Sequence, residues 1–210
     1  MSQPLPIVLA ITGASGVVYG RRLLEVLLQM NETVHLSISD SGRHVLQHEL
    51  GIEINLNRFE VQQLLPDWPR DAAQPIYHHY KDFMTPIASG SFRTLGMVIL
   101  PASMGTVGRI ASGVALDLIE RAADVHLKEA RPLVIAPREL PWNLVHLRNL
   151  TTLAEAGARI APPVPAWYHR PTTIEDMVDF LVIRVFDGLG YDLGALHRWS
   201  GPVQPQTQTR

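Results

Sequence analysis

The chain has 210 residues, of which 46% are hydrophobic and 18% charged, and its formal net charge is -2 at pH 7. This length suffices for one α/β domain with a full core but not for two ordinary domains, and the balanced charge offers no basic surface for nucleic acid or an anionic membrane. The sequence contains no cysteine, which excludes disulfides, thiolate metal sites and a cysteine nucleophile.

Short apolar runs alternate with helical patterns along the chain, which is typical of a parallel sheet covered by helices. The runs are continuous rather than alternating, as expected for strands buried on both faces. The expected strands are Ile7–Ile11, Val34–Ile38, Met97–Leu100, Leu133–Ala136 and a short one near Ala158–Ala161.

Leucines at helical spacing predict helices over Val17–Met30 and Leu144–Ala154. Thr172 and Thr173 offer an N-cap for a last helix that runs to about Asp187. Residues 51–75 contain three prolines with weak periodicity and are expected to be irregular. The pattern predicts a single-domain Rossmann-like (flavodoxin-like) α/β fold, an open parallel sheet with helices on both faces.

The start of the chain lacks the basic segment and apolar stretch of a secretion signal, and no apolar run approaches the roughly 18 residues of a membrane span. We therefore expect a cytoplasmic protein that binds small molecules rather than nucleic acid or a membrane. Residues 1–200 are expected to form the domain and residues 201–210 a flexible C-terminal tail.

Four of the predicted strands end in small, hydroxyl-bearing or charged residues. These ends read Thr12-Gly13-Ala14-Ser15-Gly16, Ser39-Asp40-Ser41-Gly42, Pro101-Ala102-Ser103-Met104-Gly105-Thr106 and Pro137-Arg138-Glu139. In an open parallel sheet, ligands bind beyond the carboxyl ends of the strands, where small residues admit a ligand and helix N-termini favour phosphate. Turn chemistry alone would also place Ser, Gly and Pro there. Four such ends together favour a nucleotide or flavin pocket.

The first strand end resembles the Thr-Gly-x-x-Gly start of the NAD(P)-dependent short-chain dehydrogenases, which also carry a Tyr-x-x-x-Lys pair such as Tyr77 and Lys81. That pair comes too early in the chain for the dehydrogenase family. Tyr19 stands where the glycine pattern needs a glycine, and Ser39 replaces the acidic residue that would hold a ribose hydroxyl. The dehydrogenase is kept as an alternative only.

Arg121 and Lys128 are seven residues apart on a predicted helix and therefore share one face, two turns apart. Two cations on one face, leading into a strand that ends at Arg138, suit a second phosphate. The other interpretation is a solvated stripe in which Asp124 and Lys128 form an i, i+4 ion pair.

Several stretches, in the same order along residues 5–200, closely resemble the UbiX/Pad1 family of flavin prenyltransferases. They are Thr12 to Gly16, Ala88 to Ser91, Glu120 to Glu129, Arg131 to Val134 with Pro137 to Glu139, and Tyr168 to Pro171. The resemblance implies a metal-independent enzyme that joins the dimethylallyl unit of dimethylallyl monophosphate to N5 and C6 of reduced FMN. The product, prenylated FMN, would serve UbiD-type decarboxylases in ubiquinone biosynthesis or aromatic-acid metabolism. The family also implies a homo-oligomer, often a dodecamer.

The resemblance places the flavin at the strand ends, with Ser15 near N5 and Glu49 close to the isoalloxazine. It places the phosphate of FMN mainly at Ser39, the Ser103 turn and Arg138. The implied FMN-binding residues are Gly13, Ala14, Ser15, Ser39, Ser103, Met104, Gly105, Thr106 and Arg138.

For the prenyl phosphate, the family pattern points to Lys128, Tyr168 and Arg184. Neighbouring subunits would contribute a further set, so that the site is shared between chains: Ser89, Gly90, Ser91, Arg121 and Glu139. Glu139 would move protons during ring closure, and Trp199 would form an aromatic wall of the pocket. Without the resemblance, packing or surface ion pairing would explain Tyr168, Arg184 and Trp199.

A related group with the same FMN-binding fold, the flavin-dependent decarboxylases of peptidyl-cysteine and phosphopantothenoylcysteine, is the main alternative. These enzymes use a histidine where this chain has Ser89-Gly90-Ser91, and an asparagine where it has Gly105 and Thr106. His78 and His79 lie upstream of that position and do not match it. A non-enzymatic flavin carrier would not need Lys128, Tyr168 and Arg184 beside the flavin.

The sequence gives no indication of a metal site. His44 and His48 are four residues apart and could share a helix face, but no third ligand lies near them. We expect a histidine pair on a helix surface and no metal.

Overall fold

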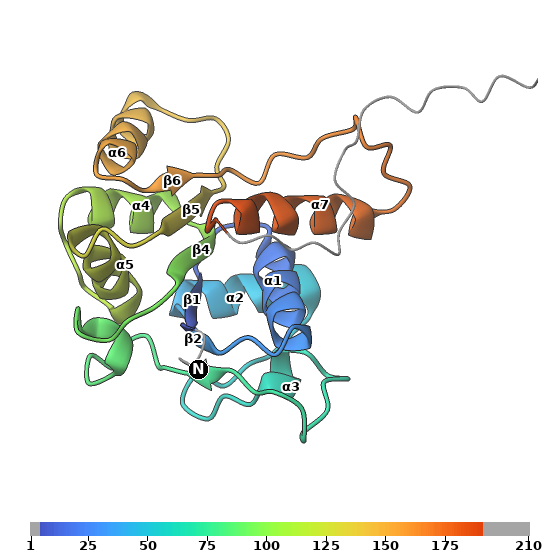
Figure 1. Cartoon of the computed structure of the whole chain (residues 1–210). Coiled ribbons are helices and arrows are strands. Elements are labelled where there is room, and N and C mark those ends of the chain that lie inside the picture. The colour runs from blue at the N-terminus through green and yellow to red at the C-terminus, as the bar shows by residue number, and fades with distance from the viewer. Residues whose placement is uncertain (1–4, 191–210) are drawn as a thin grey trace, which may run out of the picture.

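The computed structural model describes residues 5–190 and contains a six-stranded sheet with helices packed on both faces (Figure 1). The strands are β1 (Ile7–Ile11), β2 (Val34–Ile38), β3 (Ile76–Tyr77), β4 (Gly96–Ala102), β5 (Leu133–Pro137) and β6 (Arg159–Ile160). They stand in the order β3-β2-β1-β4-β5-β6, and every pairing is parallel. The predicted α/β fold with one open parallel sheet is confirmed.

The helices connect these strands. They are α1 (Val17–Gln29), α2 (Asp40–Leu50), α3 (Val61–Leu64), α4 (Met104–Ala111), α5 (Leu118–Lys128), α6 (Leu144–Glu155) and α7 (Ile174–Asp187), with a 3-10 turn at Pro86–Ala88. The expected strands and helices agree with these bounds to within two residues. Two elements within or next to the proline-rich stretch were not expected, the four-residue α3 and the two-residue edge strand β3, because elements this short carry no periodic signal.

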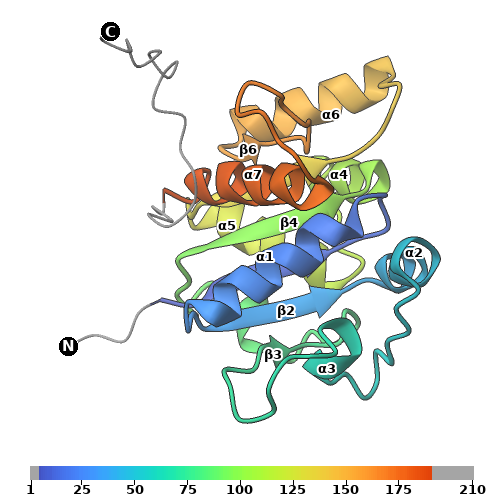
Figure 2. The same ribbon diagram turned by 90° about the vertical axis from the view of Figure 1, so that its right-hand side faces the viewer.

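The two faces of the sheet follow from the alternation of side chains along the central strands. Ile7, Leu9 and Ile11 of β1 are buried in one cluster with α1 and α7, which lie side by side over the sheet (Figure 2). Val8 and Ala10 point the other way, into a second cluster with α4, α5 and α6. Both faces of β1 are therefore buried, which explains its unbroken apolar sequence.

The strand order places a switch point between β1 and β4, since the chain builds outward to β2 and β3 on one side and to β5 and β6 on the other. Ligands of open α/β sheets bind at the carboxyl ends of such strands. One buried hydroxyl fastens the two strand ends together: Thr12 Oγ1 donates to the Pro101 carbonyl at 2.9 Å and accepts from the Ser103 amide at 2.8 Å. This contact fixes the spacing of the two loops that follow β1 and β4.

No helix in residues 5–190 is both long enough and apolar enough to cross a membrane.

Candidate active site

The backbone amides at the start of α1, directly after the β1 loop, already have a hydrogen-bond acceptor within the chain. Gly16 is the N-cap with φ of 95°, a left-handed conformation that favours glycine. The Glu49 carboxylate, from the last turn of α2, accepts from the Gly16 amide at 2.9 Å and from the Val17 amide at 3.3 Å. A negative charge thus already satisfies the N-terminus of α1.

The glycine at position 13 is required by packing within the chain. A Cβ built on Gly13 would lie 2.3 Å from the Cβ of Ser41, at the start of α2. The side chain of Ala14 is buried, whereas Ser15 is partly exposed at the edge of the sheet. Of these three residues, Ser15 therefore offers the accessible polar side chain.

Two serines cap the helices that follow β2 and β4. The Ser39 hydroxyl accepts from the Gly42 amide at 3.0 Å, and the Ser103 hydroxyl accepts from the Thr106 amide at 3.3 Å. The hydroxyl oxygens of Ser103 and Thr106 lie 3.0 Å apart. A capping hydroxyl keeps its own proton for donation, so this edge carries donors beside the positive end of α4.

The remaining members of the α4 turn contribute less through their side chains. Met104 is 8% exposed and packs into the core, so it can offer only its backbone to a ligand. Gly105 is exposed.

Arg138 follows β5 at the same edge of the sheet. Its amide donates to the Ala102 carbonyl at 3.2 Å, which sets it beside the Ser103 turn. The side-chain Nε is buried and has no hydrogen-bond partner among the described residues. Buried polar atoms are normally paired, so this orphaned donor next to the Ser103 turn fits a phosphate-bearing group such as FMN. The neighbouring Glu139 is exposed, and its Oε1 accepts from the Leu140 amide at 3.1 Å.

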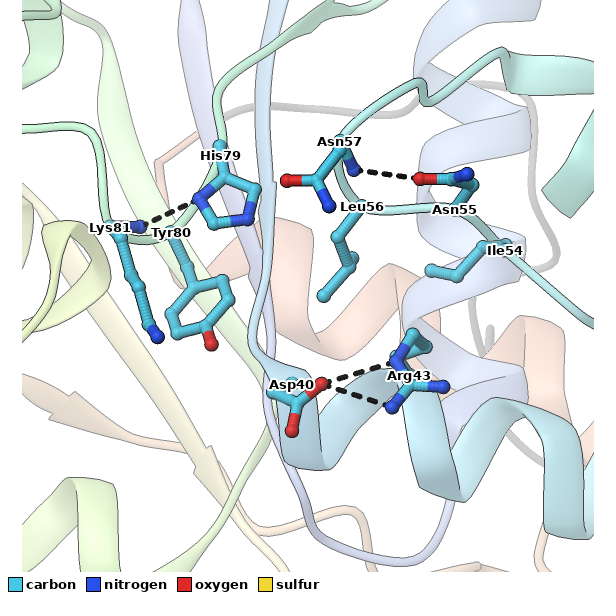
Figure 3. A pocket seen from close by; sticks show the side chains of 9 residues that line it. All are labelled: Asp40, Arg43, Ile54, Asn55, Leu56, Asn57, His79, Tyr80 and Lys81. Atoms are coloured by element: carbon cyan, nitrogen blue, oxygen red, sulfur yellow. Dashed lines mark hydrogen bonds and ion pairs between the residues drawn. The ribbon is translucent and has the colours of Figure 1, made fainter.

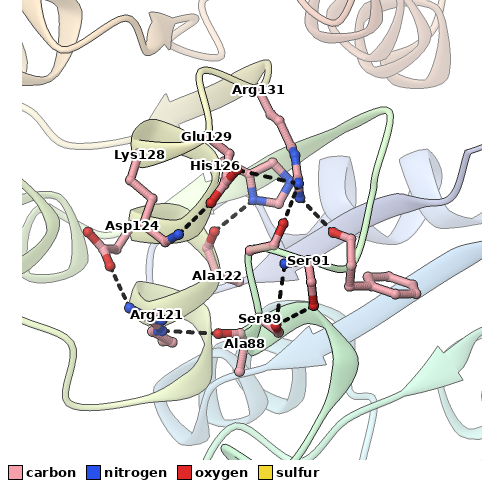
Figure 4. Close-up of polar contacts among 12 residues, drawn as sticks. Ala88, Ser89, Ser91, Arg121, Ala122, Asp124, His126, Lys128, Glu129 and Arg131 are labelled. Atoms are coloured by element: carbon pink, nitrogen blue, oxygen red, sulfur yellow. Dashed lines mark hydrogen bonds and ion pairs between the residues drawn. The ribbon is translucent and has the colours of Figure 1, made fainter.

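A second cluster of predicted residues lies along α5 (Figure 4). Arg121 Nε donates to the Ala88 carbonyl at 3.1 Å, and its Nη1 pairs with Asp124 at 2.8 Å. Lys128 Nζ pairs with Glu129 Oε1 at 2.5 Å. The alternative ion pair between Asp124 and Lys128 is therefore wrong, because Asp124 pairs one turn back with Arg121. Arg121 and Lys128 instead border one segment, residues 88–91.

The segment Ser89-Gly90-Ser91 fits closely against the end of α5. The hydroxyl oxygens of Ser89 and Ser91 are 2.9 Å apart, and a Cβ on Gly90 would lie 2.6 Å from Lys128 Nζ and 2.3 Å from Glu129 Oε1. The hydrogen bond from Lys128, together with its charge and that of Arg131, holds the pKa of the Glu129 carboxyl below its usual value. The cluster thus combines the paired hydroxyls of Ser89 and Ser91 with the ammonium of Lys128, which the backbone of Gly90 approaches closely.

The two clusters lie at opposite ends of the parallel strands, one at the amino ends and one at the carboxyl ends. Lys128 ends α5 shortly before β5 begins, whereas Arg138 follows the other end of β5. A strand of five residues spans about 17 Å. The structure therefore brings the expected FMN residues together and brings the Ser89–Ser91 group together with Arg121 and Lys128, but it does not join these two sets within one chain.

Tyr168 and Arg184 belong to a third region, made by α7 and the segment that precedes it. That segment runs outward from the sheet before the chain returns in α7 (Figure 1). The Tyr168 ring is 57% exposed and packs edge-on against Phe180, with 5.4 Å between ring centroids. Arg184 is exposed and pairs with Asp187 at 2.9 Å. Trp199 lies outside the described residues.

The Tyr77 and Lys81 pair does not form the helical dyad of a dehydrogenase. Tyr77 lies in β3, where burial raises the pKa of its phenol, and its hydroxyl has no hydrogen-bond partner among the described residues. Lys81 lies in the turn beyond the strand, with its ammonium 5.5 Å from the centroid of the Tyr80 ring. The two side chains therefore do not share a helix face.

A cavity of about 580 Å³ is lined by none of the predicted site residues (Figure 3). It lies on the outer side of α2, where Asp40 and Arg43 form an ion pair at 3.1 Å and face residues 54–57 and 79–81. His44 is exposed and lies 3.6 Å from Asp40. Among residues 5–190, no group of three or more His, Asp or Glu side chains is placed to hold a metal ion.

Sequence reasoning named Thr12 and Arg131 within motifs but gave neither a role. Thr12 joins two strand ends that are 89 residues apart in sequence, and Arg131 contacts carbonyls of the segment before β4. No local pattern signals such contacts, because they depend on which strands become neighbours. A threonine directly after a buried strand was the one available hint.

The fold and the edge it presents define a class of protein. A sheet of this order, with hydroxyl-bearing loops at its carboxyl edge, is typical of proteins that bind a phosphorylated flavin or nucleotide there. The sequence model of the Flavoprotein family matches residues 1–186, so the chain is a member of this class.

Individual relatives narrow the class. The flavin prenyltransferase UbiX of Synechocystis sp. is 46% identical over 209 residues, which cover 97% of this chain and 99% of the relative. The crystal structure of AnUbiX (PadA1) in complex with FMN and dimethylallyl pyrophosphate has a TM-score of 0.83 and 39% identity, covering 95% of this chain and 99% of that one. A dodecameric FMN-dependent UbiX-like decarboxylase from Escherichia coli O157:H7 has a TM-score of 0.81 and 35% identity, covering 94% and 100%. The chain belongs to the UbiX family of flavin prenyltransferases.

Membership of this family confirms the resemblance seen in the sequence and makes the chain an enzyme, a flavin prenyltransferase. The prediction of a prenyltransferase is thereby favoured over the dehydrogenase and over the cysteine-type decarboxylases.

Proposed function

We propose that the chain transfers the dimethylallyl unit of dimethylallyl monophosphate to N5 and C6 of reduced FMN, with FMN held at the carboxyl edge of its sheet. The observation that carries this assignment is the buried Nε of Arg138, which has no hydrogen-bond partner among residues 5–190 and lies at the carboxyl edge that also carries the capping hydroxyls of Ser39 and Ser103. It is supported by near full-length similarity to AnUbiX, whose crystal contains FMN and a prenyl pyrophosphate.

On the flavin side, reduced FMN supplies the nucleophilic N5 and C6 positions. Ser39, Ser103, Thr106 and Arg138 bind its phosphate and ribityl chain through hydroxyl, amide and guanidinium donors. The backbones of Gly13, Ala14, Met104 and Gly105 line the flavin, and Ser15 presents its hydroxyl near N5. Glu49 acts indirectly, since its carboxylate fixes the Gly16 turn in which this hydroxyl is carried.

On the donor side, Lys128, Arg121, Tyr168 and Arg184 bind the phosphate of the prenyl donor together with the Ser89-Gly90-Ser91 turn. Negative charge grows on this phosphate as the allylic C–O bond breaks, so cations and hydroxyl donors aimed at it lower the barrier. Glu139 exchanges a proton with the reacting groups during ring closure. Trp199 is assigned to the aromatic wall that excludes water.

The two halves of this site come from different subunits of a homo-oligomer. The separation of Lys128 from Arg138 by the length of β5 supports this arrangement. An apolar surface next to Glu139 supports it too, because four side chains there are exposed by 45% or more: Leu140, Leu144, Val145 and Leu147. Exposed patches of this kind mark interfaces. Since the Escherichia coli relative is a dodecamer, we propose the same assembly.

The product, prenylated FMN, is proposed to pass to a UbiD-type decarboxylase in the cytoplasm, either for quinone synthesis or for aromatic-acid metabolism. We further propose that residues 1–200 form the enzyme domain and that 201–210 are a tail.

The proposal is tested by incubating the purified protein with reduced FMN and dimethylallyl monophosphate, without oxygen, and measuring the mass of the flavin. We expect the flavin to gain one C5 unit. A parallel incubation with dimethylallyl diphosphate identifies the donor, and one with a cysteine-terminated peptide tests decarboxylation. An unchanged flavin mass together with loss of carbon dioxide from the peptide would show that the proposed function is wrong.

A further inference from the structure

Residues 88–94, which connect the 3-10 turn at Pro86–Ala88 to β4, are held by side chains of α5 and its C-terminal turn at every second residue. Figure 4 shows these contacts for the first part of the segment. Arg121 holds the Ala88 carbonyl at 3.1 Å, and the His126 ring bonds the Thr94 hydroxyl at 2.8 Å. Between these two anchors, Arg131 donates hydrogen bonds to two backbone carbonyls of the segment. Its Nη2 donates to the Gly90 carbonyl at 2.5 Å and its Nη1 donates to the Phe92 carbonyl at 2.6 Å.

The end of α5 directs Arg131 toward this segment. Ala130 has φ of 51°, the Ala130 amide donates to the Leu127 carbonyl, and the Arg131 amide donates to the His126 carbonyl at 2.8 Å. This pattern is a Schellman-type helix end, which turns the chain sharply back. The Arg131 side chain is 15% exposed, so its two hydrogen bonds are shielded from water.

Glu129 links Arg131 to the ammonium of Lys128. Its Oε1 lies 2.5 Å from Lys128 Nζ, and its Oε2 lies 3.9 Å from Arg131 Nη2. The guanidinium, the carboxylate and the ammonium form one chain of charges along the turn at Gly90, the residue where a Cβ would collide with both Lys128 and Glu129. The position of the turn relative to the ammonium therefore depends on Arg131.

We propose that Arg131 is a positioning residue for the prenyl-phosphate half of the site, holding the Ser89-Gly90-Ser91 turn against Lys128 so that one phosphate meets both. Arg131 acts through the turn, because its Nη2 and Nη1 donate to the Gly90 and Phe92 carbonyls. This inference rests on the proposed function, which places Lys128 and the turn at the phosphate. A planar fork of donors suits two carbonyls, whereas a lysine can reach only one of them well.

The test uses the full chain in its native assembly and three variants. Arg131→Met removes both hydrogen bonds while keeping the length of the side chain, and Arg131→Lys restores one donor. Arg21→Met is the matched control, since Arg21 Nε also clamps a backbone carbonyl, that of Leu64, at 3.0 Å, on the other side of the sheet. The measurements are KM for dimethylallyl monophosphate, kcat, the Kd for FMN and amide hydrogen exchange of residues 88–94.

For Arg131→Met we expect KM to rise about tenfold or more, with kcat within about threefold of the wild type and the Kd for FMN unchanged. We expect Arg131→Lys to be intermediate and Arg21→Met to match the wild type. An unchanged KM overturns the proposal, and so does a parallel loss of FMN binding, which would indicate general damage to the structure.

Hydrogen exchange decides the question independently of turnover. Inorganic phosphate should slow exchange in residues 88–94 of the wild type and of Arg21→Met but not of Arg131→Met. Equal protection by phosphate in all of these proteins overturns the role of Arg131. A wild type that binds phosphate there but makes no prenylated FMN would instead contradict the proposed function and leave the role of Arg131 in binding intact.

Discussion

Arg138 makes a hydrogen bond through its backbone, whereas a buried donor of its side chain is left unsatisfied within residues 5–190. Its amide is fixed to the Ala102 carbonyl, while its buried Nε has no partner among the described residues. Leaving a buried donor unpaired costs about 1–3 kcal/mol, which a phosphate ligand would recover. We predict that Arg138→Met raises the Kd for FMN at least tenfold, as measured by titration of flavin fluorescence. Arg58→Met, which removes an exposed arginine in the loop before α3, serves as the control, and equal affinity in both variants would contradict this role.

Glu139 is exposed in the isolated chain, and its carboxylate accepts from the neighbouring Leu140 amide. In the proposed site its carboxylate exchanges a proton, which an amide cannot do. We predict that Glu139→Gln retains FMN binding but slows turnover by about a hundredfold or more. Single-turnover formation of prenylated FMN measures this rate directly. A rate equal to that of the wild type would remove Glu139 from the mechanism.

At the residue scale, the sequence predicted which side chains follow the strands but not the contacts that they make. The serines at positions 39 and 103 were expected at the edge of the sheet, and both are helix caps there. The contacts of Glu49 with the Gly16 amide and of Arg131 with the Gly90 carbonyl join residues 33 and 41 positions apart. Such contacts follow from the packing of whole elements, so local patterns do not carry them.

At the scale of elements, the end of α5 stores strain that can be measured. Ala130 occupies the left-handed position of the helix end with φ of 51°, where an L-residue with a Cβ is disfavoured and glycine is not. The left-handed conformation costs an L-residue about 1–2 kcal/mol, which exceeds the extra chain entropy that glycine loses on folding. We therefore predict that Ala130→Gly raises the free energy of unfolding, by up to about 1 kcal/mol, as measured by urea denaturation. Ala154→Gly, on the exposed side of α6, should lower it. The opposite signs distinguish the conformational effect from a general effect of glycine, and a loss at position 130 would contradict it.

The central strands were predictable because they are buried on both faces and therefore read as unbroken apolar runs, as in β1 and β5. The edge strand β3 was not, since it pairs with β2 through only two residues. Where helix α4 lies, the sequence predicted only a strand end and a turn. Its eight residues include two glycines, so the helical pattern over Met104–Ala111 is weak.

At the scale of the whole molecule, three buried histidines make stability depend on pH. Burial and the neighbouring His78 lower the pKa of His35 to about 4, and burial lowers the pKa of His126 to about 4 and also that of His78. His35 Nδ1 and His78 Nε2 lie 2.7 Å apart, so one shared proton satisfies both nitrogens.

The unfolded chain takes up protons near pH 6.5, where the folded chain resists them. Stability is therefore fully present above pH 6.5 and falls as the pH drops below it, by up to about 1.4 kcal/mol per pH unit for each histidine. Urea unfolding at pH 7.5, 6.5 and 5.5 measures this slope. The exposed His48 serves as a control, since His48→Gln should leave the slope unchanged. Constant stability across this range would contradict the prediction.

Periodicity predicted the strands and helices of the molecule but not which edge of the sheet each candidate residue occupies. Lys128 and Arg138 are only ten positions apart, and the intervening strand places them at opposite ends of the sheet. One chain therefore holds the two halves of the proposed site apart, and the symmetry of an oligomer can bring half-sites of different chains together.

The most direct test of this account is to mix two inactive chains. The assay keeps FMN and the prenyl donor well below the raised dissociation constants of the variants. Under these conditions Arg138→Met disables the flavin half and Lys128→Met disables the prenyl-phosphate half, so each variant alone should be nearly inactive. Mixed oligomers, purified by a different tag on each chain, contain sites in which both halves are intact. With equal amounts of the two chains, we predict about a quarter of the wild-type rate of prenylated FMN formation, since each half is intact in about half of the positions. Activity no greater than that of the separate variants would contradict a site shared between subunits.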